Sequence, residues 1–359
     1  MTPAARALAP LAAIPVLIAL AGLPACTRRT QLVPASADSA RAPVDSFAVH
    51  ARQAADHWES GLDDEAAALS ARVVREALEA RPGAPWVERA RGVLDSLGIA
   101  AEVAGGDPMI VTNLFSRTDP DGDSWPYLLW REKTGVRFQR LECHGLRLTD
   151  ATTRGFGPAS IPTDSAEAAV IWGRRVAGGL EPQLMVWRYA RGGRWDLVQT
   201  LGADSLGGTG VGEFANGDTL QQLITRTYRP TPYFDECPTC PHVLQERRFD
   251  WSRAGFVRVD EQAVPSPYAT FTAFIAALAA NDPERAAQYV VDRSLIPFAN
   301  RFEWNVPSRG RWRVAPATDE SAIEMVVLRG ANEAFRVRFE ARDRDWLIAG
   351  FEPTTRSIE

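Results

Sequence analysis

The sequence predicts a multidomain α+β protein with a helical N-terminal segment, an antiparallel β-rich middle domain and a small α+β domain at the C-terminus. Three observations predict this order. A helical apolar period runs through 44–100, apolar strands joined by glycine turns occupy 107–262, and two helices precede four strand-like runs in 265–359. A chain of 359 residues is also long enough for two or three domains with separate cores.

Charge and turn residues mark the helices of the first region. The segment 63–80 opens with acidic residues, which suit the positive end of a helix, and it repeats apolar residues on one face. Pro82 ends this helix, a second begins at Pro85 and ends before Gly98, and an earlier helix covers 45–60. We therefore expect three helices before the first strand.

Three segments of the middle region share one plan, an apolar-aromatic strand, a short turn with glycine and a second alternating strand. The segments are 128–142, 184–201 and 243–261, and the turn glycines are Gly135, Gly193 and Gly255. By subtraction of their numbers the glycines are 58 and 62 residues apart, which indicates an internal repeat near sixty residues. Each segment predicts a β-hairpin.

Acidic turns precede two of these hairpins, at 119–130 and 214–225, and 163–172 is interpreted as a degenerate third copy. The turns resemble the Asp-rich loops of FG-GAP and related propeller repeats, where carboxylates and backbone carbonyls hold calcium. The calcium ligands implied by this resemblance are Asp119, Asp121 and Asp123. The alternative is an Asp-Gly turn that only connects strands. Because three units are fewer than the four blades of a propeller, we expect a sandwich or a partial propeller.

The last region contains capped helices and alternating strands. A first helix covers 266–282, and Asp282 caps a second helix that Pro283 opens over 283–292. In the third of four strand-like runs the apolar and charged residues alternate from Phe335 onward, which predicts a sheet with one buried face. Helices followed by a curved antiparallel sheet are similar to the nuclear transport factor two-like superfamily, a cone-shaped α+β fold.

That resemblance implies two kinds of function. Members of the superfamily include isomerases and dehydratases that use an acidic base or a His/Asp pair inside the cone, and others that only bind. This chain has no histidine between 265 and 359, so the candidate acids for a base are Asp292, Glu324 and Glu340. A carboxyl base needs an apolar pocket to raise its pKa. We expect a buried acid facing a cavity in an enzyme and an apolar-filled interior in a binding module.

The stretch from Cys237 to His242 is the strongest candidate for chemistry. Covalent haem attachment needs histidine directly after the second cysteine, where Pro241 stands. A redox dithiol needs its first cysteine at a helix N-terminus, and the prolines and flanking strands argue against one. We therefore expect neither haem nor dithiol catalysis at this stretch.

Three alternatives remain open for the cysteines. The first is a disulfide among Cys143, Cys237 and Cys240, which an exported protein is expected to form. The second is structural zinc, held by the same three cysteines with His242 or His144. The third is free thiols. In the first two alternatives the motif is a staple that holds a long loop to the sheet.

Other cofactor motifs are absent from the sequence. The stretch 207–215 matches the loose pattern Gly-x-Gly-x-x-Ala, but a turn follows where a dinucleotide site needs a helix N-terminus. There is no Walker motif and no Gly-x-Ser-x-Gly elbow. The net charge is −5 and the arginines are spread evenly, which argues against a nucleic-acid partner. We therefore predict no cofactor beyond the calcium and zinc alternatives.

The N-terminus has the features of an export signal. Arg6 gives a positive start, 7–22 form an apolar run too short and too proline-broken for a good membrane span, and small residues precede Cys26. The sequence Leu23-Pro24-Ala25-Cys26 resembles the lipobox of bacterial lipoproteins, although Pro24 departs from the usual small or hydroxyl residue. The alternative is a plain secretory signal.

The lipobox resemblance implies a processed and acylated protein. In that family the signal is cut before the cysteine, so 1–25 is the expected signal peptide, Cys26 the lipidation site and 26–43 a tether without apolar periodicity. Acyl chains at about 0.8 kcal/mol per buried methylene hold a protein on a membrane without a transmembrane helix. Thr27 in place of Asp implies passage to the outer membrane, where the organism has one.

The sequence thus predicts an exported, lipid-anchored protein on the extracytoplasmic side of the cell envelope. Its predicted role is a non-catalytic module that binds a small ligand or another envelope protein. The alternative is an envelope hydrolase or isomerase with a pocket in the C-terminal cone. The aromatic residues of the hairpins fit either a contact surface or a core.

Overall fold

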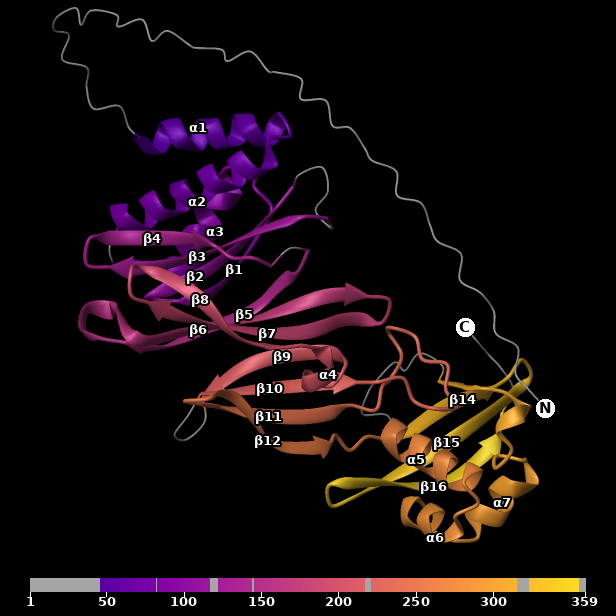
Figure 1. The fold of residues 1–359 in the computed structure, drawn as a ribbon. Helices are drawn as coiled ribbons and strands as arrows, with labels where there is room; N and C mark the ends of the chain where they lie inside the picture. Colours follow the sequence, from indigo (N-terminus) through magenta and orange to yellow (C-terminus); the bar gives the residue numbers. More distant parts are fainter. Residues whose placement is uncertain are drawn as a thin grey trace, which may run out of the picture. The chain divides into compact units, whose positions relative to one another are not determined.

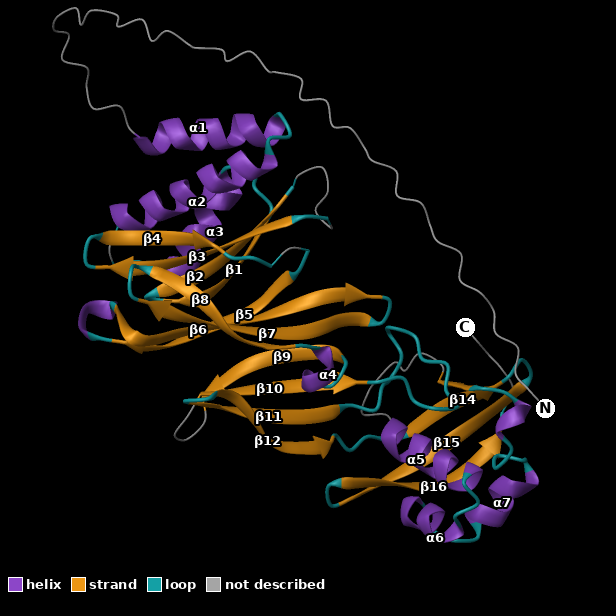
Figure 2. Cartoon of the chain, in the orientation of Figure 1, coloured by secondary structure: helices purple, strands orange, loops and turns teal. Residues whose placement is uncertain are grey.

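The computed structural model describes residues 46–81, 83–116, 122–143, 145–216, 221–314 and 323–354. Within these ranges the chain forms seven α-helices and sixteen strands, and the strands make four antiparallel sheets of four strands each (Figures 1 and 2). The fold is mixed α+β, and the expected order of helical, β-rich and α+β regions is confirmed. The predicted signal peptide and tether, with Cys26, lie outside the described residues.

Three helices open the described chain, as predicted. They are α1 (Ser46–Glu59), α2 (Asp63–Ala80) and α3 (Trp86–Ser96). Three acidic residues occupy the first turn of α2, where the helix dipole favours negative charge. The apolar faces of the helices pack with one face of the first sheet in a shared core that includes Trp58, Leu78, Trp86, Ile110 and Leu129.

Three four-stranded sheets follow, and in each the strands lie side by side in sequence order. The first contains β1 (Ala101–Gly106), β2 (Met109–Phe115), β3 (Ser124–Glu132) and β4 (Gly135–Arg140). The second contains β5 (Arg147–Phe156), β6 (Pro162–Val176), β7 (Gly179–Ala190) and β8 (Arg194–Leu201). The third contains β9 (Thr209–Asn216), β10 (Gln221–Tyr228), β11 (Gln245–Ser252) and β12 (Gly255–Ala263).

The three predicted hairpins are the last two strands of these sheets, so the hairpins and their repetition are confirmed. The segment 163–172, interpreted as a third acidic turn, lies inside β6, so that interpretation is wrong. Its nearly continuous apolar run belongs to a strand buried between two sheets, with side chains facing the two cores in turn. Short helices connect the strands, namely η1 (Pro158–Ser160) and α4 (Ala203–Leu206).

Neighbouring sheets share hydrophobic cores. Met109 and Trp130 of the first sheet pack in one core with Trp172 of the second. Ile171, on the other face of β6, packs in a second core with Trp251 of the third sheet. The helices and the three sheets therefore form successive layers, each pair joined by apolar side chains.

The other face of the third sheet carries mostly charged and polar side chains, with Val211 and Val257 exposed among them. On β11, Phe249 and Trp251 point into the core, while Glu246 and Arg248 alternate to the opposite face. There Glu246 pairs with Arg226 at 2.9 Å and with Arg248 at 2.8 Å. A terminal layer with a polar outer face needs no further sheet to cover it.

The glycine-rich stretch 207–215 serves the approach of β9 to β10. Gly210 has φ of 150°, and a Cβ atom there would collide with the carbonyl oxygen of Arg226. Only glycine fits such a close backbone approach. Gly210 is therefore required by the sheet itself.

The C-terminal region combines helices with the fourth sheet. Its helices are α5 (Pro267–Ala279), α6 (Pro283–Ala286), η2 (Ala287–Tyr289), α7 (Leu295–Arg301) and η3 (Pro307–Arg309). Its strands, in spatial order, are β13 (Trp312–Val314), β14 (Glu324–Arg329), β15 (Glu333–Arg342) and β16 (Asp345–Pro353). The predicted alternation on β15 is confirmed, with Phe335, Val337 and Phe339 buried.

The predicted cap at Asp282 is confirmed, a cap at Ser266 was not predicted, and the predicted length of the second helix is wrong. The side chains of Ser266 and Asp282 each accept a backbone N–H at 3.0 Å, from Ala269 and Arg285. The second helix ends at Ala286 instead of extending to 292, because the chain turns to form a bridge between Val290 and Ile348. Helix α7 was not predicted.

Aromatic side chains fill the space between these helices and the fourth sheet. Trp304 stacks on Phe351 with ring centroids 4.2 Å apart and meets Phe335 edge to face at 5.0 Å. Phe271 meets Trp312 edge to face at 5.3 Å. All five side chains are almost completely buried, so the C-terminal region has a solid aromatic core.

Candidate functional site

The predicted cysteine motif lies in the loop between β10 and β11, residues 229–244, called the β10–β11 loop below. Cys237 and Cys240 lie at disulfide distance, with 2.16 Å between their sulfur atoms. This pairing confirms the disulfide among the three alternatives for these two cysteines. The bond is local, with a sequence separation of 3, so it does not tie the loop to a sheet as we expected of a staple. It closes a single turn at the loop tip.

Cys143 is separated from this pair. Its side chain is buried in the core shared by the first and second sheets, where it is a free thiol. Desolvation by burial raises the pKa of Cys143 to about 12. Since the thiolate is the reactive and metal-binding form, this thiol is unreactive near neutral pH. His144 lies outside the described residues, and in the described part of the chain no three His, Cys, Asp or Glu side chains are grouped closely enough to hold a metal ion.

Glu236 and His242 flank the disulfide and face each other. The Nδ1 atom of His242 lies 3.7 Å from a carboxylate oxygen of Glu236, too far for a hydrogen bond. The imidazole stacks on the Tyr228 ring with centroids 3.5 Å apart. Glu236 accepts hydrogen bonds from the Tyr268 hydroxyl at 2.8 Å and from the Thr231 amide at 3.2 Å. Desolvation by burial, followed by the bond to Glu236, raises the pKa of Tyr268.

The β10–β11 loop is fastened to the C-terminal region just before the disulfide. Phe234 enters the aromatic core and meets Phe271 edge to face. The Asp235 amide donates to the Trp312 carbonyl at 2.7 Å, and the Trp312 amide donates to the Tyr233 carbonyl at 2.8 Å. The carboxylate of Asp235 also pairs with Arg311 at 2.7 Å.

Sequence reasoning missed the residues that carry these contacts. The run Tyr233-Phe234-Asp235-Glu236 places two aromatic residues and two acids directly before Cys237. An aromatic pair inside a polar loop is a signal of docking, because a loop buries large apolar side chains only where it meets another element.

The predicted calcium ligands and candidate bases are exposed or lie outside the described residues. Asp119 and Asp121 are not among the described residues, and Asp123 stands directly before β3. In the C-terminal region Asp292, Glu324 and Glu340 are all exposed. Hydrogen bonds from the backbone and side chain of Ser294 hold the pKa of Asp292 below its ordinary value. Because all three acids are exposed, none of them lies in the apolar pocket that a general base in a cone needs.

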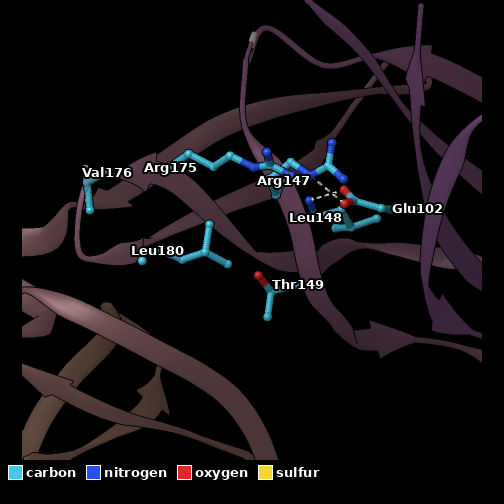
Figure 3. Close-up of a pocket in the computed structure, with 8 residues that line it drawn as sticks. Glu102, Arg147, Leu148, Thr149, Arg175, Val176 and Leu180 are labelled. Carbon is cyan, nitrogen blue, oxygen red and sulfur yellow. Dashed lines mark hydrogen bonds and ion pairs between the residues drawn. The ribbon is translucent and has the colours of Figure 1, made fainter. Parts of the chain in front are cut away.

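A pocket of about 600 Å³ opens at β1, the start of β5 and the turn between β6 and β7 (Figure 3). Its lining residues are Glu102, Arg147, Leu148, Thr149, Arg175, Val176, Gly179 and Leu180. Glu102 pairs with Arg147 at 2.8 Å and accepts the Leu148 amide at 2.6 Å. Two guanidinium groups and one carboxylate give the polar side of the pocket a net positive charge, and leucine and valine side chains supply an apolar side.

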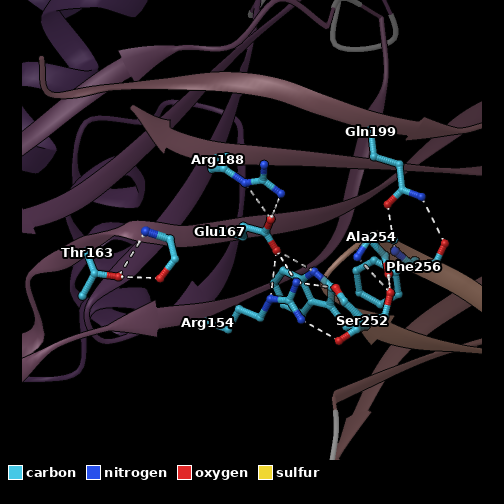
Figure 4. A network of polar contacts seen from close by, with 11 residues as sticks. Arg154, Thr163, Glu167, Arg188, Gln199, Ser252, Ala254 and Phe256 are labelled. Carbon is cyan, nitrogen blue, oxygen red and sulfur yellow. Dashed lines mark hydrogen bonds and ion pairs between the residues drawn. The ribbon is translucent and has the colours of Figure 1, made fainter. Parts of the chain in front are cut away.

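A second polar cluster joins the second and third sheets around a buried carboxylate (Figure 4). Glu167 on β6 is 3% exposed, and its two carboxylate oxygens accept bonds from Arg154, Arg188 and the indole N–H of Trp251. Arg154 also donates to the carbonyl oxygens of Trp251 and Ser252, at 2.5 and 2.6 Å. Since both oxygens of Glu167 are occupied, the cluster is a structural connection between sheets.

Comparison of the sequence with models of known protein families and with curated proteins gives no match. Among the described helices, none combines the length and the apolar composition needed to span a bilayer.

Proposed function

We propose that this protein is exported, processed before Cys26 and held by acyl chains on a membrane of the cell envelope. Where the organism has an outer membrane, we propose that this is the membrane. In this proposal its folded part is a non-catalytic module that binds a small ligand or another envelope protein. The anchor rests on the small-residue stretch that ends in Cys26. The binding role rests on one structural observation, the solid aromatic core of the C-terminal region.

The aromatic core supports binding over catalysis because it occupies the place of an active-site cavity. An enzyme of the cone type needs a cavity with a buried carboxyl group whose pKa is raised. Here the side chains of Trp304, Trp312 and Phe335 fill that interior, and the exposed acids Asp292 and Glu324 lie outside it. This arrangement supports an α+β cone used as a scaffold.

The three stacked sheets support a partial propeller that stays open. Consecutive four-stranded sheets with strands in sequence order are the blades of such a fold. The polar outer face around Glu246 supports an open stack, because no fourth blade is needed to bury it. The pocket of Figure 3 lies at β1 and β5, the first strands of two neighbouring sheets, and we propose it as the ligand site.

The anchor is tested by labelling cells that express the full chain with an alkyne analogue of palmitate. We expect label on the parent protein and complete loss of label in Cys26→Ser, which should leave the membrane fraction. Cys143→Ser is the matched control and should keep the label, because its sulfur lies in a core. An unlabelled parent chain that keeps residues 1–25 would refute the anchor.

The pocket is tested with dodecanoate, an anion with an apolar chain, by calorimetric titration of the parent protein. We expect Arg175→Gln to weaken binding roughly tenfold, since one charge-assisted contact is lost. Arg174→Gln is the matched control, because Arg174 is the neighbouring residue on β6 and pairs with Glu181 instead of lining the pocket. Equal affinity in the two variants, or no binding to the parent, would contradict the assignment.

A further inference from the structure

The β10–β11 loop connects the third sheet to the C-terminal region on both sides of its disulfide. Before the disulfide, Phe234 and Asp235 contact the aromatic core and Trp312. After it, Val243 packs against the same core, and the bond from the Val264 amide to the Leu244 carbonyl extends the β11–β12 ladder by one pair. The conformation of the turn between these contacts therefore determines whether both halves of the loop can contact the C-terminal core at the same time.

The disulfide closes that turn. The Cys240 amide donates to the Cys237 carbonyl at 3.0 Å, and the bond between the side chains closes the same four residues covalently. The chain reverses here, so that His242 returns to within 3.7 Å of Glu236. Glu236 in turn holds the Tyr268 hydroxyl of α5. The disulfide thus lies at the centre of the contacts that join the loop to the C-terminal region.

The tip of the turn is accessible to solvent. Pro238 and Thr239 are exposed, and Cys237 and Cys240 are partly exposed. Cys143, in contrast, is buried between sheets. A soluble thiol therefore reaches the paired sulfurs and not the free one, since exchange requires access for the attacking thiolate.

We propose that the Cys237–Cys240 bond is a redox-sensitive switch that sets how tightly the β10–β11 loop holds the C-terminal region. A dithiol of the surroundings attacks one sulfur as a thiolate and forms a mixed disulfide, which releases the other cysteine as a thiol. The second thiol of the reductant then displaces the remaining cysteine. The protein gains two electrons and two protons, and the dithiol becomes a disulfide. The switch does not depend on the ligand or on the lipid anchor.

Reduction removes the constraint on the turn, so the two halves of the loop separate more freely. The chain-entropy relation for a closed loop of four residues gives a change on the order of tenfold in the opening equilibrium. The opening is local, because the sheets keep their own cores.

Hydrogen exchange of the full chain, followed by mass spectrometry with and without dithiothreitol, tests this proposal. We expect peptides covering 229–244 and 307–314 to exchange roughly tenfold faster after reduction. Peptides of the first sheet should be unchanged. The double variant Cys237→Ser/Cys240→Ser should resemble the reduced parent and ignore the reductant, and Cys143→Ala should respond like the parent.

Three results would overturn the proposal. One is a reduced parent, confirmed by a mass gain of two hydrogens, whose loop exchanges at the oxidised rate. Another is a pair that excess dithiothreitol leaves oxidised, which would show that the tip is inaccessible. The third is faster exchange throughout the chain on reduction, which would mean that the disulfide supports the whole fold instead of one contact.

Discussion

Two buried interiors of this protein are built from opposite chemistry. The C-terminal region is filled with aromatic rings, among them Trp304, Phe335 and Phe351. The interface between the second and third sheets contains aromatic residues too, but at one side it buries the carboxylate of Glu167 with two arginines. Aromatic packing stabilises the folded state through the apolar area it buries and through the favourable geometry of ring pairs. A buried carboxylate is tolerated only when hydrogen bonds and opposite charges compensate for its lost hydration.

The two interiors determine different properties of the fold. Rings stack in several related ways, so the aromatic core mainly supplies stability. Arg154 reaches from Glu167 to the carbonyl oxygens of Trp251 and Ser252, where only one position of the third sheet satisfies all the bonds. We therefore expect the Glu167 cluster to determine how the second and third sheets align. We expect the aromatic core to contribute most to the free energy of unfolding.

The largest effect is expected in the aromatic core. Trp304→Ala should lower the free energy of unfolding by about 4 kcal/mol, because it deletes a buried indole that packs against several other rings and leaves a cavity. Urea denaturation followed by tryptophan fluorescence measures this. Val257→Ala, at a residue that is 48% exposed, is the control and should change stability by less than about 0.5 kcal/mol. A loss below about 1 kcal/mol for Trp304→Ala would show that the core relaxes.

A slightly smaller effect is expected at the buried carboxylate. Glu167→Gln should cost about 3 kcal/mol, because two arginines lose the charge that compensates them. The same denaturation experiment applies, with Glu181→Gln as control, since Glu181 pairs with Arg174 at the surface and should contribute below about 1 kcal/mol. Equal losses in the two variants would remove the distinction between the two interiors.

The smallest effect is expected at the outer face of the third sheet. Hydrogen bonds from Arg248, and secondarily from Arg226, hold the pKa of Glu246 below its ordinary value of 4.5 against the opposing effect of burial. A lowered pKa in the folded state means that the stabilisation is present above 4.5 and is lost as the pH falls through the folded pKa. Glu246→Gln should therefore cost about 1 kcal/mol at about pH 7 and nothing once the pH is below that folded value.

The measurement is the free energy of unfolding of parent and variant over a pH series. Both proteins share the titration of every other group, so their difference isolates Glu246. A difference that stays constant from about pH 7 down into the acid range would show that packing, and not charge, is responsible.

Local patterns made much of the fold predictable. Helix α2 and the hairpins β3–β4, β7–β8 and β11–β12 follow from periodicity and turn glycines within single segments. Capping by Asp282 was equally local. The early end of α6 was not, because Val290 leaves the helix to meet Ile348, 58 residues later by subtraction. Pairing with a distant strand overrode helix propensity there.

The candidate site was predictable only in part. Two closely spaced cysteines favour a disulfide where a chain is exported, as we propose for this one. Three cysteines nevertheless allow several pairings, and only the burial of Cys143 between two sheets decides among them. Glu167 was missed because its partners Arg154, Arg188 and Trp251 come from three other strands. The available signal was a single acid followed by an apolar run in one strand, which indicates a buried charge in need of partners.

The sequential strand order shapes how a nascent chain reaches its native state. In every sheet of the described chain each strand pairs with its neighbour in the sequence, so pairing closes short loops and keeps the contact order low. Each sheet is able to assemble as soon as its fourth strand has emerged, before later ones exist. The bridges from Phe234 to Trp312 and from Val290 to Ile348 span longer separations, and they form late in synthesis.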